Sequence, residues 1–488
     1  MMFSVLFSVA FAAPDEAPPE APDADSAAEA PAGPDRSGPP EVLPPIPLDL
    51  DDLTQHSLGE GLDVWLVNVP RLRKAEIEVI WWKGRTDLSQ GYDPAEAAMA
   101  SIWRTATEKY DGDALSELTD VLDVDLWAYL GDHRAGAGVQ VPLEDLDQGL
   151  DILADVALHP TFPKRELKLD QEQTERYYTV IGPASPSRVT NAAMSYAWNP
   201  ADHPYGYRPD PEAYGALKQS DLVAVHERLV QQGPVSIVVV GDITWEDLEP
   251  RLKSRFGELG ASGERSEVLD APTPTESRAI LIPMEDTEQV SISMRLAAPG
   301  RLDDRYATMS AVGYALGGHF LARINKNLRE EKGWTYGAGA YYSAGKKRGS
   351  FNVSVDIPGD KVAGAVREIE KEFANVVSGG VTQDELDAWW RGEVMSFNTV
   401  RGTLDDATRF YSALLVEEVE VKDRRARLDA FEAVSIEDTQ TVAGEILGED
   451  APRIWVFTGP EEAIQAAADD LGLDSEIVPP RKAILGDL

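Results

Sequence analysis

Two residues in the stretch LREEKGWTYG, Arg329 and Tyr336, have side chains that could act together on one substrate. A guanidinium offers forked donors that suit a peptide carbonyl or a carboxylate, and a phenol can donate a hydrogen bond to an oxyanion. Both residues also have an ordinary structural interpretation. An arginine in a last helical turn compensates the helix dipole, and a tyrosine in a hairpin usually packs across strands. The residue types alone leave both interpretations open.

The elements around this pair can be predicted from the glycines. The helix that carries Leu328 is expected to end at Gly333, which can adopt the left-handed capping conformation, and the chain should then enter a strand that holds Tyr336. Residues 306–332 have a helical pattern that two adjacent glycines, Gly317 and Gly318, interrupt. These glycines predict either a simple kink or a bend that guides substrate.

Residues 335–357 are predicted to form a β-hairpin with its turn at residues 345–348, because large apolar residues alternate with polar ones after the turn. Phe351, Val353, Val355 and Ile357 are expected on one face. The turn itself is basic, and its three cations are interpreted as a solvated hairpin tip rather than a binding patch: Lys346, Lys347 and Arg348.

The order of predicted elements occurs twice along the chain. LDVWLVNVP and AEIEVIWWKG open the first half and VSIVVVGD closes it, whereas RAILIPM and VSISMRLAAPG open the second half and APRIWVFTGPEEAI closes it. Such a repeat indicates an internal duplication, with domains at residues 49–262 and 273–488. We predict an α+β fold of two similar domains, each a mostly antiparallel sheet covered on one face by helices.

Composition excludes several classes of function. The chain has 488 residues and a formal net charge of −40, so it should repel a nucleic-acid backbone. It has no cysteine, which excludes disulfides, thiolate zinc sites and cysteine nucleophiles. After the first residues, no stretch approaches the roughly 18 apolar residues that a transmembrane segment needs.

The N-terminus has the pattern of an export signal followed by a tether. An apolar run in residues 1–13 is followed by small residues that suit signal-peptidase cleavage, although the usual basic region is missing. Residues 14–48 are rich in Pro, Ala, Asp and Glu and have little to bury, which predicts a disordered acidic tether. Together they favour the periplasm or cell surface over the cytoplasm.

The histidines are scattered. The sequence has six, and no two lie within five positions of each other: His56, His133, His159, His203, His226 and His319. Two imidazoles can share one metal on a helix only when they are about one turn apart, so no helical zinc motif is present.

The duplicated order, with HPTFPKREL, HPYG, IVVVGD and LREEKGWTYG in sequence, resembles the M16 (pitrilysin-like) family of zinc peptidases and their processing-peptidase relatives. The resemblance covers the chain from Leu53 to about Ala468. It implies one half of an M16 clamshell (a LuxS-like metallohydrolase-type fold) that encloses a peptide-cleaving chamber. In that family an arginine and a tyrosine seven residues apart reach toward substrate, and Arg329 and Tyr336 match this pattern.

The catalytic signature of the family is absent. His-x-x-Glu-His aims two imidazoles at one zinc while the glutamate polarises the metal-bound water, and a further glutamate ligand follows on a later helix. In this sequence the two histidine positions fall on Ala97 and Ser101, the general base on Ala100 and the later ligand on Tyr177. We therefore expect no zinc in this chain.

Three functions are consistent with these patterns. The first is a non-catalytic subunit of a heterodimeric M16 peptidase, in which a partner chain carries zinc and this chain contributes Arg329 and Tyr336 to peptide binding. The second is a non-proteolytic peptide-binding or scaffold protein that retains the fold. The third is an autonomous hydrolase with a novel site, which would require zinc in the isolated protein.

Overall fold

The computed structural model describes residues 53–89, 93–260, 263–400, 402–419 and 421–488, which belong to one compact unit. The expected signal peptide at residues 1–13 and the acidic tether at residues 14–48 lie outside the described residues. In the part of the chain that is described, no helix is both long enough and apolar enough to cross a membrane.

The first half contains a six-stranded sheet in the order β1-β2-β6-β3-β5-β4. Neighbouring strands are antiparallel except β2 and β6, which run parallel. The strands are β1 (Leu53–Gly59), β2 (Leu62–Asn68), β3 (Lys74–Trp81), β4 (Asp125–Leu130), β5 (Ala135–Pro142) and β6 (Val235–Gly241).

The second half contains a six-stranded sheet in the order β12-β7-β11-β8-β10-β9. Here β7 runs parallel to both β11 and β12, and the other pairs are antiparallel. The strands are β7 (Arg278–Pro283), β8 (Gln289–Pro299), β9 (Ala338–Ala344), β10 (Arg348–Pro358), β11 (Arg453–Gly459) and β12 (Ser475–Ile477).

The two sheets have the same topology apart from one edge strand each. β2, β6, β3, β5 and β4 correspond in order and direction to β7, β11, β8, β10 and β9, while β1 and β12 differ. This correspondence confirms the predicted duplication and the α+β class. The predicted hairpin is also confirmed, with its turn between β9 and β10 and with Phe351, Val353, Val355 and Ile357 buried.

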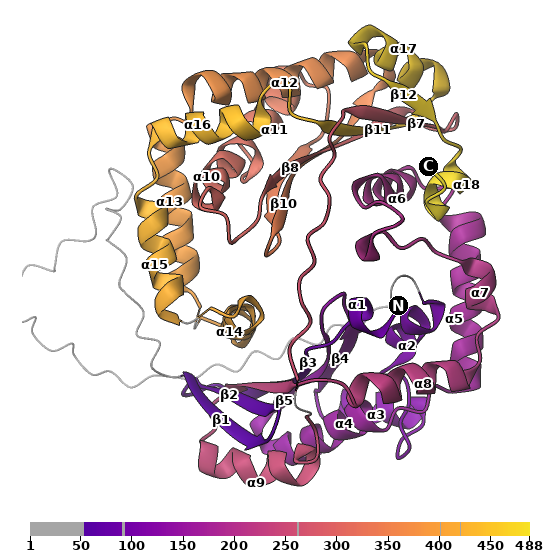
Figure 1. The fold of residues 1–488 in the computed structure, drawn as a ribbon, viewed down its shortest axis with the longest axis vertical. Helices are drawn as coiled ribbons and strands as arrows, with labels where there is room; N and C mark the ends of the chain where they lie inside the picture. Colours follow the sequence, from indigo (N-terminus) through magenta and orange to yellow (C-terminus); the bar gives the residue numbers. More distant parts are fainter. Residues whose placement is uncertain (1–52, 90–92, 261–262, 401, 420) are drawn as a thin grey trace, which may run out of the picture. The chain divides into compact units, whose positions relative to one another are not determined.

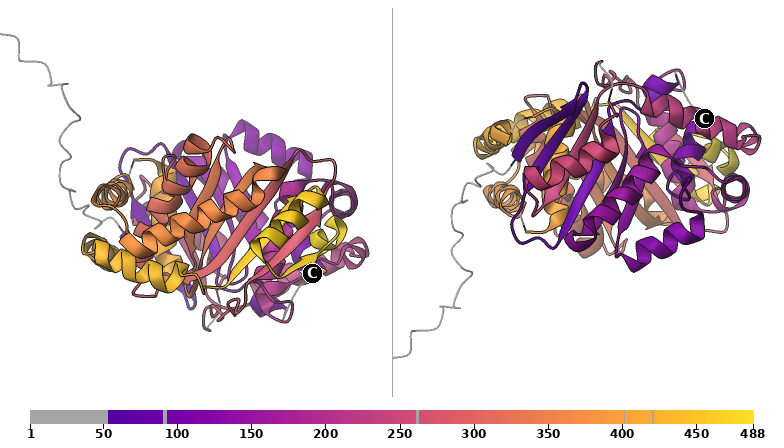
Figure 2. Two further views of the ribbon diagram at one scale, coloured as in Figure 1. Left: turned by 90° about the horizontal axis from the view of Figure 1, so that it is seen from above. Right: turned by 90° about the horizontal axis from the view of Figure 1, so that it is seen from below.

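Helices cover the outer face of each sheet (Figure 1). The first hydrophobic core lies between the first sheet and α2, α4, α8 and α9, and the second between the second sheet and α10, α12, α16 and α17. Figure 2 (left) shows the orange helix α12 lying across the strands of the second sheet.

The helices of the first half are α1 (Arg85–Leu88), α2 (Pro94–Ile102), α3 (Gly112–Val121), α4 (Leu146–Leu158), α5 (Lys164–Arg176), α6 (Pro186–Trp198), α7 (Pro211–Gly215), α8 (Gln219–Val230) and α9 (Trp245–Phe256). Those of the second half are α10 (Tyr306–Gly317), α11 (Arg323–Asn325), α12 (Val362–Gly379), α13 (Gln383–Asn398), α14 (Leu404–Glu417), α15 (Val421–Glu432), α16 (Ile436–Leu447), α17 (Glu461–Leu471) and α18 (Pro480–Leu485).

Each half also sends a helix to the inner face of the other half's sheet. Helix α14 packs on β3 and β6, where Leu414 lies against a cluster that includes Val238 and Val240. Helix α6 packs on β7, β8 and β11, and Thr190 donates a hydrogen bond to Thr458 over 2.7 Å. Both sheets are therefore covered on two faces, not on one as predicted.

The central strands explain this difference. β6 (VSIVVVG) and β11 (RIWVFTG) are buried along their whole length, and alternate residues of each strand belong to different hydrophobic clusters. A continuous apolar run is typical of a strand that is covered on both faces. The apolar runs in the sequence therefore indicate that these strands are buried on both faces, but they do not indicate which helix covers the second face.

Candidate functional site

The helix expected to carry the degenerate metal site is α2, which begins where the Asp93 carboxylate caps the Ala95 N–H at 2.9 Å. Ala97 and Ala100 are partly buried against the first core. Ser101 donates a hydrogen bond from Oγ to Oδ1 of Asp170 on α5, at 2.6 Å. The polar contact at this end of α2 is therefore a serine–aspartate hydrogen bond.

Tyr177, the expected third position, lies elsewhere. It is the first residue of a π-helical segment (Tyr177–Ile181) that continues α5, about 10 Å along the helix from Asp170. Its ring packs edge-on against Tyr178 at 5.0 Å and lies beneath the Arg188 guanidinium at 5.4 Å. Ser101 thus contacts α5 two turns before Tyr177.

The residues on α2 do not fit zinc. A protein zinc site needs three or four Cys, His, Asp or Glu ligands in tetrahedral arrangement, whereas the expected ligand and base positions on α2 hold Ala97, Ala100 and Ser101 beside one aspartate. Among the described residues, no group of three His, Cys, Asp or Glu is placed to hold a metal ion.

Helix α2 also carries a buried carboxylate that was not predicted from the sequence. Glu96 is fully buried, accepts a hydrogen bond from Ser89 at 3.1 Å, and has Arg228 of α8 at 3.7 Å. Burial raises its pKa to about 7, although Arg228 opposes that shift. These contacts tie α2 to α8, so Glu96 has a structural explanation in the packing of the two helices.

Arg329 lies in the second half, in a π-helical segment (Lys326–Glu331) that follows α11. Its guanidinium stacks over the Phe320 ring at 4.4 Å, and its Nη1 lies 3.0 Å from Oε1 of Glu330. The helix ends at Gly333, whose φ is 65°. Trp334 donates its backbone N–H to the Leu328 carbonyl over 3.0 Å, which completes the predicted left-handed cap.

Tyr336 lies in the loop two residues before β9, so the prediction that it sits within the strand is wrong. A turn holds it there, in which the Thr335 hydroxyl contacts both the carbonyl and the N–H of Gly337. The extended pairing with β10 starts only at Ala338, so the phenol has no cross-strand neighbour and is 95% exposed.

A buried asparagine connects the loop that holds Phe320, the ring under Arg329, to the start of β9, two residues after Tyr336. Asn325 donates from Nδ2 to the Phe320 carbonyl at 2.6 Å and accepts the Ala338 N–H on Oδ1 at 2.8 Å. Phe320 and Leu321, in the break after Gly317, are 62% and 61% exposed. We call Phe320, Leu321, Arg329 and Tyr336 the Arg329 patch. The glycine pair thus ends α10 and begins the loop of this patch.

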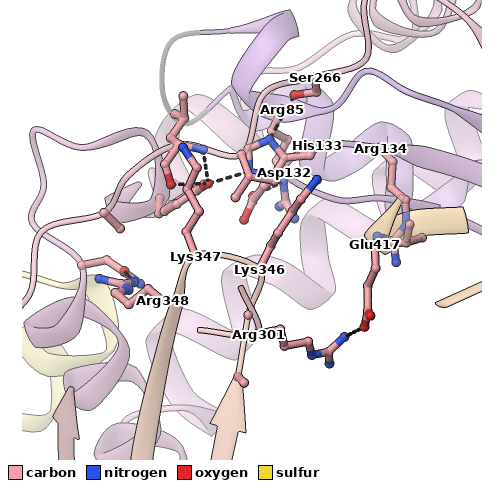
Figure 3. A pocket seen from close by; sticks show the side chains of 18 of the residues that line it. Arg85, Asp132, His133, Arg134, Ser266, Arg301, Lys346, Lys347, Arg348 and Glu417 are labelled. Atoms are coloured by element: carbon pink, nitrogen blue, oxygen red, sulfur yellow. Dashed lines mark hydrogen bonds and ion pairs between the residues drawn. The ribbon is translucent and has the colours of Figure 1, made fainter. Parts of the chain in front are cut away.

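A second candidate site is a cavity of about 950 Å³ whose wall combines both halves of the chain. It is called here the basic cavity, because nine cationic side chains line it: Arg85, Arg134, Arg188, Arg265, Arg301, Lys346, Lys347, Arg348 and Arg427. Figure 3 shows the β9–β10 turn entering it with Lys346, Lys347 and Arg348. The interpretation of this turn as a solvated tip is therefore wrong.

Three carboxylates in the wall offset part of this charge: Asp132, Glu417 and Glu418. Glu417, at the end of α14, is 8% exposed and pairs with Arg301 and with Arg427 at 3.1 Å. Glu418 pairs with Lys346 at 2.5 Å. The cations outnumber the carboxylates three to one, in a chain whose formal net charge is −40.

His133 closes one side of the basic cavity. Its Nε2 lies 2.6 Å from the Tyr205 hydroxyl, and its Nδ1 lies 3.0 Å from Ser266 in the segment between the halves. Burial lowers the pKa of His133, so the imidazole is mainly neutral near pH 7. The ring therefore adds hydrogen bonds, rather than charge, to the wall.

Comparison with known proteins defines the class of protein to which this fold corresponds. A family model described as the peptidase M16 inactive domain matches residues 216–389. A crystal structure of a peptidase M16 inactive domain from Pseudomonas fluorescens superposes with a TM-score of 0.74 at 20% identity, covering 84% of this chain and 98% of that one. The chain therefore has the M16 fold, and its predicted resemblance to that family is confirmed.

Two further proteins are similar to this chain. An uncharacterized zinc protease of Mycobacterium leprae, ML0855, is 21% identical over 409 residues, which is 80% of this chain and 88% of that protein. The periplasmic protease PqqL from Escherichia coli superposes with a TM-score of 0.71 at 13% identity, covering 86% of this chain but only 46% of PqqL.

Proposed function

We propose that this chain is a non-catalytic M16-type subunit that binds peptide through the Arg329 patch, beside a zinc site carried by a separate chain. The observation that carries the proposal is an asymmetry. The α2 positions are occupied by Ala97, Ala100 and Ser101, whereas Arg329 and Tyr336 are both present, with Arg329 partly exposed and Tyr336 fully exposed to solvent. An exposed aromatic cluster beside an arginine is typical of a surface that binds a partner.

The two polar side chains would have different tasks at a peptide. Stacking on Phe320 fixes the plane of the Arg329 guanidinium, and the N–H groups that do not face Glu330 can donate to a carbonyl or carboxylate. The Tyr336 phenol can donate to the oxyanion that forms as water attacks the peptide carbonyl. The partner's zinc would activate that water.

The size of PqqL supports an assembly of two chains. This chain covers less than half of PqqL, so one PqqL chain has room for two units of this size. We infer a heterodimer in which this chain supplies one half and the zinc-bearing chain the other. The N-terminal pattern of residues 1–13 and 14–48 supports its location in the cell envelope.

The proposal predicts how variants behave in a mixed peptidase assay. The purified chain is mixed with a zinc-bearing M16 chain from the same organism, and cleavage of a quenched fluorescent peptide is measured as kcat/KM. Tyr336→Phe should lower kcat/KM about a hundredfold, because one oxyanion donor is lost, and Arg329→Ala should lower it at least about tenfold. Tyr341→Phe, on the same hairpin, is the matched control and should have no effect.

Two results would reject this role. The first is cleavage of the peptide by the partner without this chain at the same kcat/KM. The second is the same kcat/KM for the Tyr336→Phe and Tyr341→Phe mixtures. If peptide binds this chain but no mixture cleaves it, the non-proteolytic peptide-binding or scaffold function replaces the subunit role.

A further inference from the structure

We infer that the basic cavity binds an acidic peptide segment, through carboxylates that the cationic wall contacts from both halves of the chain. This site is distinct from the Arg329 patch. Tyr336 precedes β9 and Lys346 follows it, so the seven residues of β9, about 23 Å of extended chain, lie between them. The inference therefore goes beyond the proposed function and does not depend on it.

The charge of the wall is the first argument. Like charges in a partly enclosed space repel one another more strongly than on an open surface, because the local dielectric constant is lower. Burial lowers the pKa of Arg348, and the neighbouring Arg295 lowers it further. An anionic ligand would relieve this repulsion. Asp270, outside the wall, pairs with Lys347 at 3.1 Å and offsets part of the surplus of cations, and the remaining surplus leaves charge for a ligand to neutralise.

Two of the cations are available to a ligand. In the described part of the chain, neither Arg188 nor Arg348 has a carboxylate within ion-pairing distance. Arg348 is held by the Pro272 carbonyl at 2.8 Å and by Asn199 at 2.7 Å. Both acceptors are neutral, so this guanidinium is fixed in place while its charge stays uncompensated.

Stacking prepares several guanidiniums for carboxylates. Arg265 lies over Trp82 at 3.8 Å and Arg188 over Tyr177 at 5.4 Å. A guanidinium that rests on a ring directs its N–H groups outward in its own plane, where a carboxylate can accept two of them. The same surfaces offer aromatic faces to the apolar parts of a peptide.

Size and lining favour a peptide over a small inorganic anion. A volume of about 950 Å³ is at the upper end of the range for ligand cavities, far larger than a single phosphate requires. Apolar side chains such as Leu269 and Val416 also line it. In Figure 3, Arg85 and Arg134 approach from one side and Lys346 to Arg348 from the other, so several charges along one segment can be contacted at once.

The test is fluorescence anisotropy with the full chain and a short labelled peptide of alternating Glu and Ala. Arg188→Gln combined with Arg348→Gln should weaken binding at least about tenfold, equivalent to about 1.4 kcal/mol. The matched control is Arg165→Gln combined with Lys168→Gln on α5, whose side chains are 78% and 76% exposed outside the cavity wall. It removes the same charge and should leave affinity unchanged.

Three further arms decide the ligand class. A peptide with Gln in place of Glu should not bind, and tripolyphosphate should compete only weakly. Arg329→Ala should leave the affinity unchanged, which separates this site from the proposed peptidase role. Equal binding of the Gln peptide, equal loss in both double variants, or binding of tripolyphosphate without the Glu peptide would each overturn the inference. Circular dichroism checks that every variant is folded.

Discussion

At the residue scale, buried histidine explains part of the expected pH dependence. His226 on α8 is 4% exposed, lies 3.0 Å from the Ala157 carbonyl through Nε2, and packs edge-on against Trp103 at 5.4 Å. Burial lowers its pKa to about 4, although the hydrogen bond to Ala157 opposes the shift. The folded protein therefore holds this ring neutral at pH values where the unfolded chain would protonate it.

The sign of the effect follows from proton linkage. The unfolded histidine takes up its proton near its ordinary value of 6.5, so the free energy of unfolding falls between about pH 6.5 and pH 4 as the pH decreases. The loss should amount to about 3 kcal/mol, because each unit of pKa difference is worth about 1.4 kcal/mol.

We therefore predict that His226→Gln flattens the pH profile of stability. Urea unfolding at about pH 7 and about pH 4 should show a loss for the natural chain that exceeds the loss for His226→Gln by about 3 kcal/mol. His203→Gln, which removes a histidine that is not buried, is the control and should retain the full pH dependence. Parallel profiles for the natural chain and His226→Gln would contradict this account.

At the element scale, two exchanged helices join the halves. Helix α14 belongs to the second half by sequence but covers the inner face of the first sheet, and α6 does the reverse. Because each sheet is completed by a helix of the other half, we expect the described chain to unfold in one cooperative transition.

Leu414→Ala tests the contribution of α14 to this arrangement. Leu414 is 1% exposed in the cluster with Val238 and Val240, so truncation should lower the free energy of unfolding by about 2–5 kcal/mol. Val121→Ala on α3 removes a side chain that is 76% exposed and should change it by less than about 0.5 kcal/mol. Both values come from urea denaturation followed by tryptophan fluorescence and circular dichroism.

Equal stability of the two variants would show that α14 does not hold the first sheet. Two separate transitions in Leu414→Ala, with only the first half destabilised, would show instead that the halves unfold independently. Coincident fluorescence and circular dichroism curves are the result we expect.

Local signals in the sequence were sufficient for much of the fold. The Gly333 cap and the β9–β10 hairpin each depend on a few neighbouring residues, and both were predicted correctly. At Gly317 and Gly318 a kink or bend was predicted, whereas α10 ends there and helical structure resumes only at Arg323. The error at Tyr336 also has a local cause. Its turn is closed by Thr335 and Gly337, so the strand begins after the aromatic residue rather than at it.

At the scale of the whole molecule, the sequence could not predict the basic cavity. Its cations come from turns and helix ends that are far apart in the chain, between Arg85 and Arg427, and only Lys346 to Arg348 form a visible cluster. A basic turn on an isolated hairpin would be solvated. Here the other half lies opposite it, and long-range packing of that kind leaves no periodic pattern in the sequence.

The distribution of charge and the residues at the expected zinc-ligand positions both favour a peptide-binding role for the whole molecule. A chain with a formal net charge of −40 gathers cations in one cavity, exposes an aromatic patch around Arg329, and carries alanine and serine at the positions where the M16 resemblance predicts zinc ligands. We propose that such a chain binds peptides and leaves the activation of water to another subunit.

The central claim is that this polypeptide does not hold catalytic zinc, and metal analysis of the purified full-length chain tests it most directly. The chain is loaded with zinc, dialysed, and measured by mass spectrometry for bound metal, with peptide cleavage followed in parallel. We predict substoichiometric zinc and no cleavage by the chain alone. Stoichiometric zinc that survives dialysis, together with cleavage that a chelator abolishes, would contradict the account.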